Sequence, residues 1–170
     1  MKRLIIGIVL VAMLCMAACA SMMSPIDWYT KGNEVYHAGD VKTAIEYWTN
    51  AIELEPGFAE AYYNRGVAYS ELGRHADAVA DYTSAIRVNP KYVWAYENRG
   101  IAYRNLGNYE EAIADYTQAL VLDPKKTTVY YNRGICYFYL GDTENAAADF
   151  RKACQMGNSD ACEALEELDE

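Results

Sequence analysis

The side chains that most often carry out catalysis are few in this 170-residue chain, and they form no familiar catalytic pattern. His37 and His75 are the only histidines, and neither belongs to an HExxH motif or stands near a nucleophile motif. The sequence has no glycine-rich phosphate loop and no cysteine or histidine cluster at zinc spacing. Carboxylates recur at Asp81, Asp115 and Asp149, but three copies of one active site are not expected. The sequence therefore predicts a protein that is not an enzyme and that has no cofactor, metal or small-molecule substrate.

The recurring aspartates have arginine companions. Arg65, Arg99 and Arg133 recur in the same three segments of the chain as the aspartates. Because a guanidinium and a carboxylate can pair through two parallel hydrogen bonds, we expect a structural ladder of Arg–Asp contacts between helices. The alternative, in which these arginines face a ligand, stays open at this point.

These pairs belong to a repeat of 34 residues that occurs four times without insertion. Three columns of equivalent positions carry it, one aromatic, one of glycine and one of alanine: Trp28, Tyr62, Tyr96 and Tyr130; Gly32, Gly66, Gly100 and Gly134; Ala44, Ala78, Ala112 and Ala146. Such self-similarity indicates a repeat architecture, in which each unit buries its apolar face against its neighbours.

Each repeat is predicted to be a pair of helices. Tyr62, Gly66 and Tyr69 fall on one helical stripe, and the same spacing relates Ala78, Tyr82 and Ala85 on a second helix. Glycine at the end of the first helix, as at Gly73, accepts the left-handed conformation that follows a helix terminus. Proline after the second helix, as at Pro90, stops it.

The spacing of these residues resembles the tetratricopeptide repeat (TPR). The resemblance implies an all-α solenoid, an α-α superhelix of four helix hairpins at residues 25–58, 59–92, 93–126 and 127–160. Residues 161–170 have apolar and acidic side chains on opposite faces, so they are expected to form a capping helix with a solvated outer face.

The first helices of this family line a concave groove that binds peptides or proteins. On the resemblance, the groove of this chain is formed by Tyr63, Asn64, Trp94, Asn98, Arg104, Tyr131, Asn132 and Phe138. The aromatic members would anchor a partner and the asparagines would pair with its backbone, unless these side chains instead pack against neighbours or satisfy local groups. The basic clamp with which some relatives hold chaperone tails is incomplete, because Tyr29, Trp94 and Asn98 replace three basic residues, so that activity is not expected.

The N-terminus has the layout of a secretory signal. Lys2 and Arg3 precede an apolar stretch and then small residues, which predicts a signal peptide over 1–18 and a short tether over 19–24. Residues 17–21 resemble the lipobox of bacterial lipoproteins, which implies a lipidated Cys19 carrying acyl chains such as palmitate. Ala20, in place of aspartate, then implies the periplasmic face of the outer membrane. The alternative is an uncleaved transmembrane anchor in the inner membrane with a periplasmic domain.

The resemblance to this family also implies that two further cysteines are paired. Cys154, Gly157 and Cys162 are similar to the pattern in cysteine-linked relatives of this repeat, which implies a Cys154–Cys162 disulfide between adjacent helices. An oxidising periplasm would permit it. The alternative is that both are small buried apolar residues. Cys136 is expected to be free and packed.

The charge of the chain limits its partners. A formal net charge of −9 repels phosphate backbones and anionic membrane surfaces, which argues against nucleic acid. We therefore expect a lipid-anchored scaffold of the cell envelope that binds another envelope protein or peptide. The alternative is a regulatory accessory subunit of an envelope enzyme or of a secretion or pilus assembly.

Overall fold

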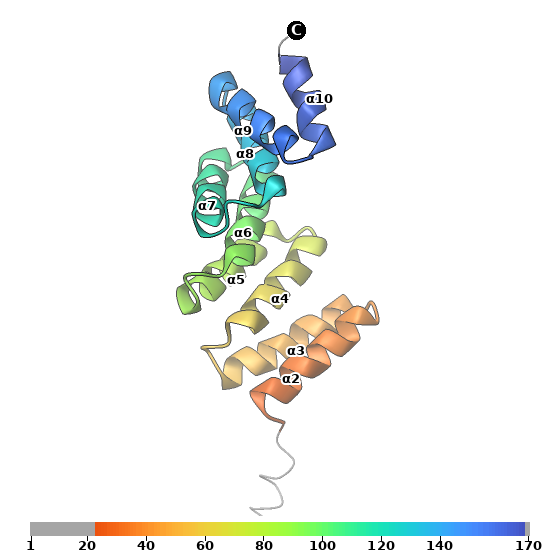
Figure 1. Cartoon of the computed structure of the whole chain (residues 1–170). Coiled ribbons are helices and arrows are strands. Elements are labelled where there is room, and N and C mark those ends of the chain that lie inside the picture. The colour runs from red at the N-terminus through yellow and green to blue at the C-terminus, as the bar shows by residue number, and fades with distance from the viewer. Residues whose placement is uncertain (1–22, 169–170) are drawn as a thin grey trace, which may run out of the picture. The chain divides into compact units, whose positions relative to one another are not determined.

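The computed structural model describes residues 23–168, and this part of the chain is helical without strands (Figure 1). Its helices are α2 (Pro25–His37), α3 (Val41–Leu54), α4 (Ala59–Glu71), α5 (His75–Val88), α6 (Val93–Asn105), α7 (Tyr109–Leu122), α8 (Thr127–Tyr139), α9 (Thr143–Gln155) and α10 (Ser159–Leu168). The prediction of an all-α fold is confirmed. The predicted signal peptide, Cys19 and most of the predicted tether lie outside the described residues.

The chain divides into two compact units, one ending at Glu55 and the other beginning at Pro56. The described part of the first unit is the hairpin of α2 and α3. A Cβ atom added to Gly32 would lie 2.5 Å from Trp48 Nε1, so only glycine lets the α2 backbone meet this buried ring. Trp48 Nε1 also donates a hydrogen bond of 3.1 Å to Asn33 Oδ1. Contact between the Trp48 ring and Gly32 thus brings α2 and α3 close together.

The second unit contains three helix hairpins and α10. Helices pack in pairs within each repeat, α4 with α5, α6 with α7 and α8 with α9, and the pairs join through α5 with α6 and α7 with α8. The first helices also touch along the array, α4 with α6 and α6 with α8, so they form one layer and the second helices form the other. The last neighbour contact is between α9 and α10. The repeat therefore buries its apolar stripes against the next repeat, as its sequence predicts.

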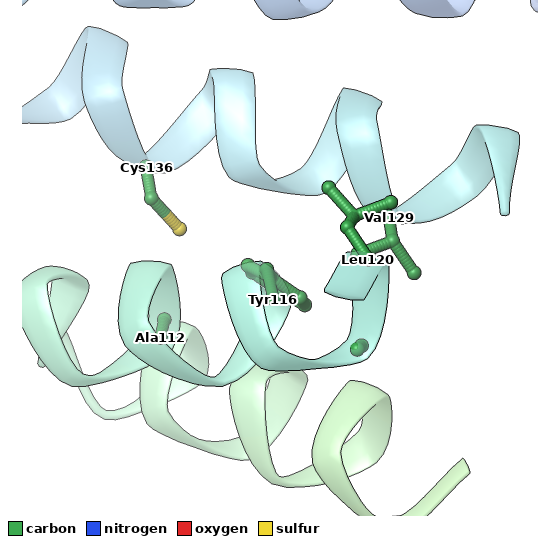
Figure 2. Packing of buried hydrophobic residues seen from close by; sticks show 6 residues of the cluster. Ala112, Tyr116, Leu120, Val129 and Cys136 are labelled. Carbon is green, nitrogen blue, oxygen red and sulfur yellow. The ribbon is translucent and has the colours of Figure 1, made fainter. Parts of the chain in front are cut away.

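The core between α7 and α8 shows how small and large residues combine. Ala112 and Tyr116 on α7 face Val129 and Cys136 on α8, and all four are fully buried (Figure 2). Across the repeat, a Cβ atom on Gly100 would lie 2.7 Å from the Tyr116 ring, so α6 and α7 approach closely at this glycine. Cys136 is a free, buried cysteine, as expected from its place in the repeat.

The helix ends follow the residues that the sequence provides. Gly107, just after α6, has φ of +80°, a conformation that favours glycine. Helix α5 ends at Val88, just before Asn89 and Pro90. One boundary differs from the prediction, because α10 begins at Ser159 and not at residue 161. The Asn158 side chain accepts a hydrogen bond of 2.7 Å from the Ala161 amide and so caps the helix two residues earlier.

The Arg–Asp ladder is present in all three predicted repeats, and each pair joins the two helices of one repeat. Arg99 donates from Nε and from one terminal nitrogen to the two Asp115 oxygens, each at 2.7 Å. Arg65 with Asp81 and Arg133 with Asp149 repeat this geometry. Burial raises the pKa of the Asp115 carboxyl above its usual value, and the hydrogen bonds from Arg99 oppose that rise. These arginines are engaged inside the fold, so the alternative in which they face a ligand is not favoured.

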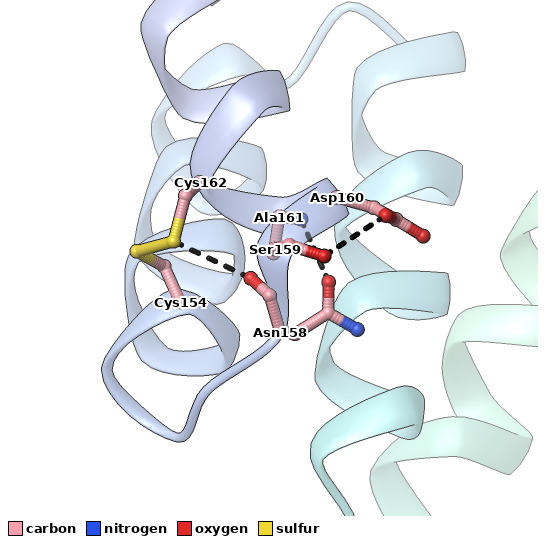
Figure 3. The surroundings of a disulfide bond; sticks show 6 residues. All are labelled: Cys154, Asn158, Ser159, Asp160, Ala161 and Cys162. Carbon is pink, nitrogen blue, oxygen red and sulfur yellow. Dashed lines mark hydrogen bonds between the residues drawn. A yellow bond between two sulfur atoms is a disulfide. The ribbon is translucent and has the colours of Figure 1, made fainter.

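The capping helix is joined to α9 by a covalent bond. Cys154, on α9, and Cys162, on α10, form a disulfide across the turn that contains Gly157 (Figure 3). Ala161 is fully buried beside it and belongs to the same apolar cluster as Phe150. The disulfide, the buried alanine and the Asn158 cap together fix where α10 lies against α9.

Within residues 23–168, no helix is both long enough and apolar enough to cross a membrane.

Candidate functional site

The eight predicted groove residues all lie on the first helices of the second unit, α4, α6 and α8. Two of them are largely exposed, Trp94 at 56% and Phe138 at 50% of their surface. The other six are half-buried: Tyr63, Asn64, Asn98, Arg104, Tyr131 and Asn132. The face therefore presents two large apolar side chains to solvent on α6 and α8, with a partly covered polar strip between them.

Tyr63 and Asn98 bond to each other. The Asn98 amide donates a hydrogen bond of 2.9 Å to Tyr63 Oη, which joins α4 to α6. The Tyr63 ring packs against Tyr92 and Tyr82, with centroid distances of 4.9 and 5.9 Å. Burial raises the pKa of Tyr63 above its usual value, while the bond from Asn98 lowers it. Tyr63 is therefore a neutral, packed residue that positions Asn98.

A second polar pair joins α6 to α8. Arg104 donates a hydrogen bond of 2.7 Å to Asn132 Oδ1. Next to it, the Tyr131 ring packs against Phe150 of α9, with a centroid distance of 5.8 Å. Four of the eight predicted residues thus form hydrogen bonds with one another, in two pairs. These bonds set the spacing of α4, α6 and α8.

A buried ionic cluster on the same face was not predicted. Glu97 is a buried carboxylate on α6 that accepts hydrogen bonds from Lys126 Nζ and from the Thr128 hydroxyl. The Lys126 ammonium also lies 2.9 Å from the centroid of the Trp94 ring. A cation held against one ring by a carboxylate fixes the position of that ring. The cluster therefore holds Trp94 in place although more than half of its surface is exposed.

Two hollows open on the part of this face nearest the C-terminus. The first has a volume of about 310 Å³ and lies between α8, α9 and α10, with Ile135, Phe138, Phe150 and Leu168 among its lining residues. The second, of about 340 Å³, lies beside it and includes Arg104, Asn105 and Tyr109.

The two hollows share Ile135 and Tyr139 in their walls. The Tyr139 ring stacks on Tyr109, with centroids 5.0 Å apart and planes 8° from parallel. These hollows and the exposed Phe138 form one continuous surface from α6 to α10. We call it the α8–α10 surface, after the two helices that face each other across the first hollow.

The histidines and the free cysteine of the described residues do not lie together on this face. His37 is exposed at the end of α2, while His75 is half-buried at the start of α5. Burial raises the pKa of the Cys136 thiol to about 11, so this cysteine is protonated at neutral pH. Within residues 23–168, no group of three or more histidine, cysteine or acidic side chains could hold a metal ion.

Several residues of this face were not predicted from the sequence. Glu97 stands where the neighbouring repeats have Tyr63 and Tyr131, and this break in an aromatic column was a visible signal. Lys126 and Tyr139 gave no such signal, because their roles depend on neighbours from other repeats. The same holds for Ala164, Glu167 and Leu168 of α10, which line the first hollow.

Comparison with known proteins identifies the repeat. The model of the tetratricopeptide repeat family matches residues 59–92, 93–126 and 128–156, and a second TPR repeat model matches residues 32–73. In a crystal structure of MamA, 26% of aligned residues are identical, 82% of each chain is covered, and the TM-score is 0.78. The first TPR domain of Spaghetti (RPAP3), bound to the HSP90 peptide SRMEEVD, is 29% identical with a TM-score of 0.67, covering 69% of this chain and 94% of that one.

A sequence relative supports the same identification over a shorter stretch. An uncharacterized protein of Methanocaldococcus jannaschii, MJ0572, is 45% identical over 50 residues, which are 29% of this chain. The match spans 58% of that relative's length. With the family model covering more than half of the sequence, the chain belongs to the tetratricopeptide repeat family, whose fold is that of a scaffold for protein–protein interaction.

Proposed function

We propose that this protein is a scaffold of the bacterial cell envelope that holds a partner protein or peptide on the first-helix face of its second unit. The observation that carries the proposal is the presence of two largely exposed aromatic rings, Trp94 and Phe138, on that face of a TPR domain. Large aromatic residues dominate the energetics of protein interfaces when a partner covers them. The structure of Spaghetti with a bound peptide supports a peptide as one form of this partner.

The envelope location is supported by the sequence at both ends of the chain. A basic start, an apolar stretch and the lipobox-like residues around Cys19 favour export and lipid anchoring, with the outer membrane as the destination. A disulfide between Cys154 and Cys162 is compatible with an oxidising compartment such as the periplasm. The tether would keep the scaffold near the membrane and raise its effective concentration for membrane-associated partners.

A crosslinking experiment in intact cells tests the proposal. A photoreactive phenylalanine analogue replaces Trp94 or Phe138 in separate variants, and Val121 serves as the matched control. Val121 is also apolar and is 70% exposed, but it lies on α7 in the other helix layer. We expect one shared partner protein to be captured from both first-helix positions and not from the control.

The anchor is tested in the same cells. Cys19→Ala is expected to abolish labelling by a clickable palmitate analogue and to leave an unprocessed chain. Capture of the same proteins from Val121, or no specific capture from either aromatic position, would contradict the binding face. Unchanged labelling and processing of the Cys19→Ala chain would contradict the lipid anchor alone.

A further inference from the structure

The hollow between α8 and α10 has an apolar lining with a single charged member. Ile135 and Phe138 come from α8, Phe150 from α9 and Leu168 from α10, while Glu167 adds a carboxylate on the α10 side. A volume of about 310 Å³ exceeds that of one large side chain and is at the lower end for binding pockets. The hollow is therefore large enough for a bulky apolar side chain and part of its backbone.

The helices that form the walls of this hollow are joined to one another by covalent, apolar and ionic contacts. Helix α10 is attached to α9 by the Cys154–Cys162 disulfide and by the buried Ala161. The α8 wall is set by the ion pair of Arg133 with Asp149 of α9. A preformed pocket does not require ordering of its own side chains on binding, which favours affinity.

The charged side chains of α10 are all acidic, and one of them, Glu167, lines the hollow. Helix α10 carries four acidic residues and no basic residue: Asp160, Glu163, Glu166 and Glu167. Arg133 of α8 is already paired, and Arg151 and Lys152, which follow Phe150 on α9, do not line the hollow. At the far end of the α8–α10 surface, Arg104 belongs to the second hollow. The charge available to a partner in the first hollow is thus the Glu167 carboxylate of α10.

We infer that the α8–α10 surface binds a segment of another protein that inserts a bulky apolar side chain between α8 and α10 and places a lysine or arginine beside Glu167. The inference rests on the proposed function and specifies the chemistry of its partner. The apolar side chain supplies affinity through burial against Phe138 and Leu168. The basic residue sets the direction of the segment, because Glu167 lies at one end of the surface and Arg104 at the other.

A library of random short peptides displayed on phage tests this inference with the full chain purified in detergent. We expect enrichment of sequences that contain a Leu, Ile, Phe or Met with a Lys or Arg nearby. One enriched peptide, made synthetically with a fluorescent label, then serves as the probe for affinity measurements. Absence of enrichment, or enrichment of sequences with acidic flanks, overturns the inference.

Two charge-reversal variants on α10 separate the pocket from general electrostatics. Glu167→Lys is expected to weaken the probe at least about fivefold, because it turns an attraction into a repulsion. Glu163→Lys changes the net charge by the same amount on an exposed residue that does not line the hollow, so its effect should be clearly smaller. Equal losses for the two variants overturn the inference.

A third variant removes the apolar lining. Leu168→Asp is expected to abolish measurable binding of the probe, with the helical content and melting curve of the chain compared with wild type. Should this variant unfold α10, Glu167→Lys still decides the question, because it changes an exposed side chain. Binding of the probe that survives Leu168→Asp in a folded chain counts against the pocket.

Other occupants of the hollow would give different results. A second copy of this chain would appear as a dimer in sedimentation that Leu168→Asp dissociates, and an acyl chain would appear as binding of a fluorescent fatty acid that displaces the probe. Either result overturns the inference. Specific crosslinking from Trp94 with no effect of Glu167→Lys would leave the scaffold function in place and refute only this pocket.

Discussion

Removal of the buried Asp115 carboxylate is predicted to destabilise the second unit strongly. Asp115→Ala leaves the Arg99 guanidinium without the two oxygens that accept its hydrogen bonds at 2.7 Å. The side chains of the pair are only 16% and 7% exposed, so water can replace the lost carboxylate only in part. An unpaired charge left in such a place is costly.

The expected loss in the free energy of unfolding follows from the burial of the Arg99–Asp115 pair. Breaking a fully buried ion pair costs about 3–5 kcal/mol. Because Arg99 keeps some exposure and also donates to the Thr83 hydroxyl, we expect a loss near the lower limit, about 3 kcal/mol. For a chain of this length, that corresponds to a fall in Tm of about 6–12 °C. The assay is urea unfolding followed by far-ultraviolet circular dichroism.

A matched pair in the same protein provides the control. Arg74 and Asp77 also form an ion pair of 2.7 Å, but their side chains are about half exposed. Asp77→Ala should therefore cost less than about 1 kcal/mol. The double variant Arg99→Leu with Asp115→Ala should be more stable than Asp115→Ala alone, because no buried charge remains. Equal losses for Asp115→Ala and Asp77→Ala would refute the reasoning.

Three further changes test other parts of the structure. Gly100→Ala should lower the free energy of unfolding by about 1–3 kcal/mol, since the new Cβ lies 2.7 Å from the buried Tyr116 ring, whereas Gly57→Ala, with no neighbour within 4 Å, should not. Tyr116→Phe should raise it by about 1 kcal/mol or more in urea unfolding, because the buried hydroxyl has no hydrogen-bond partner within residues 23–168. Hydrogen bonds with Ser24 lower the pKa of Asp27, so its contribution is present above the unfolded pKa and is lost as pH falls through the folded value. The difference in helix content between wild type and Asp27→Asn should therefore shrink as pH falls from about 5 to about 2.

Each of these has a clear contrary result. Equal stabilities of Gly100→Ala and Gly57→Ala would show that the ring accommodates a methyl group. A destabilised Tyr116→Phe would mean that the hydroxyl is satisfied in solution. A difference between wild type and Asp27→Asn that does not change with pH would show that the carboxylate does not stabilise the start of α2.

The fold could be predicted because the repeats carry the same types of residue at equivalent positions. The helix ends that precede Gly107 and Pro90 depend on single residue types with well-defined conformational effects. The Arg–Asp ladder could be inferred because arginine and aspartate recur together in three repeats. What the repeat could not predict was the start of α10, where Asn158 replaces the usual proline and acts as a cap.

The candidate site was less predictable, because its contacts join residues from different repeats. Sequence spacing places Asn98 and Asn132 on the right face of their helices. It does not say that Tyr63 and Arg104 reach them from neighbouring repeats. Periodicity identifies a face, while the pairing of side chains across that face depends on the packing of one helix against the next.

These pairings change how the face would recognise a partner. The sequence suggested that the asparagines pair with the backbone of a bound peptide, but Asn132 Oδ1 already accepts a hydrogen bond from Arg104. Asn98 likewise donates one hydrogen of its amide to Tyr63. A partner that competed for these bonds would have to leave Arg104 or Tyr63 with an unpaired polar atom, which costs free energy. Affinity is therefore expected to come mainly from burial of apolar side chains against Trp94 and the α8–α10 surface, with the polar strip acting to keep the helices at a fixed spacing.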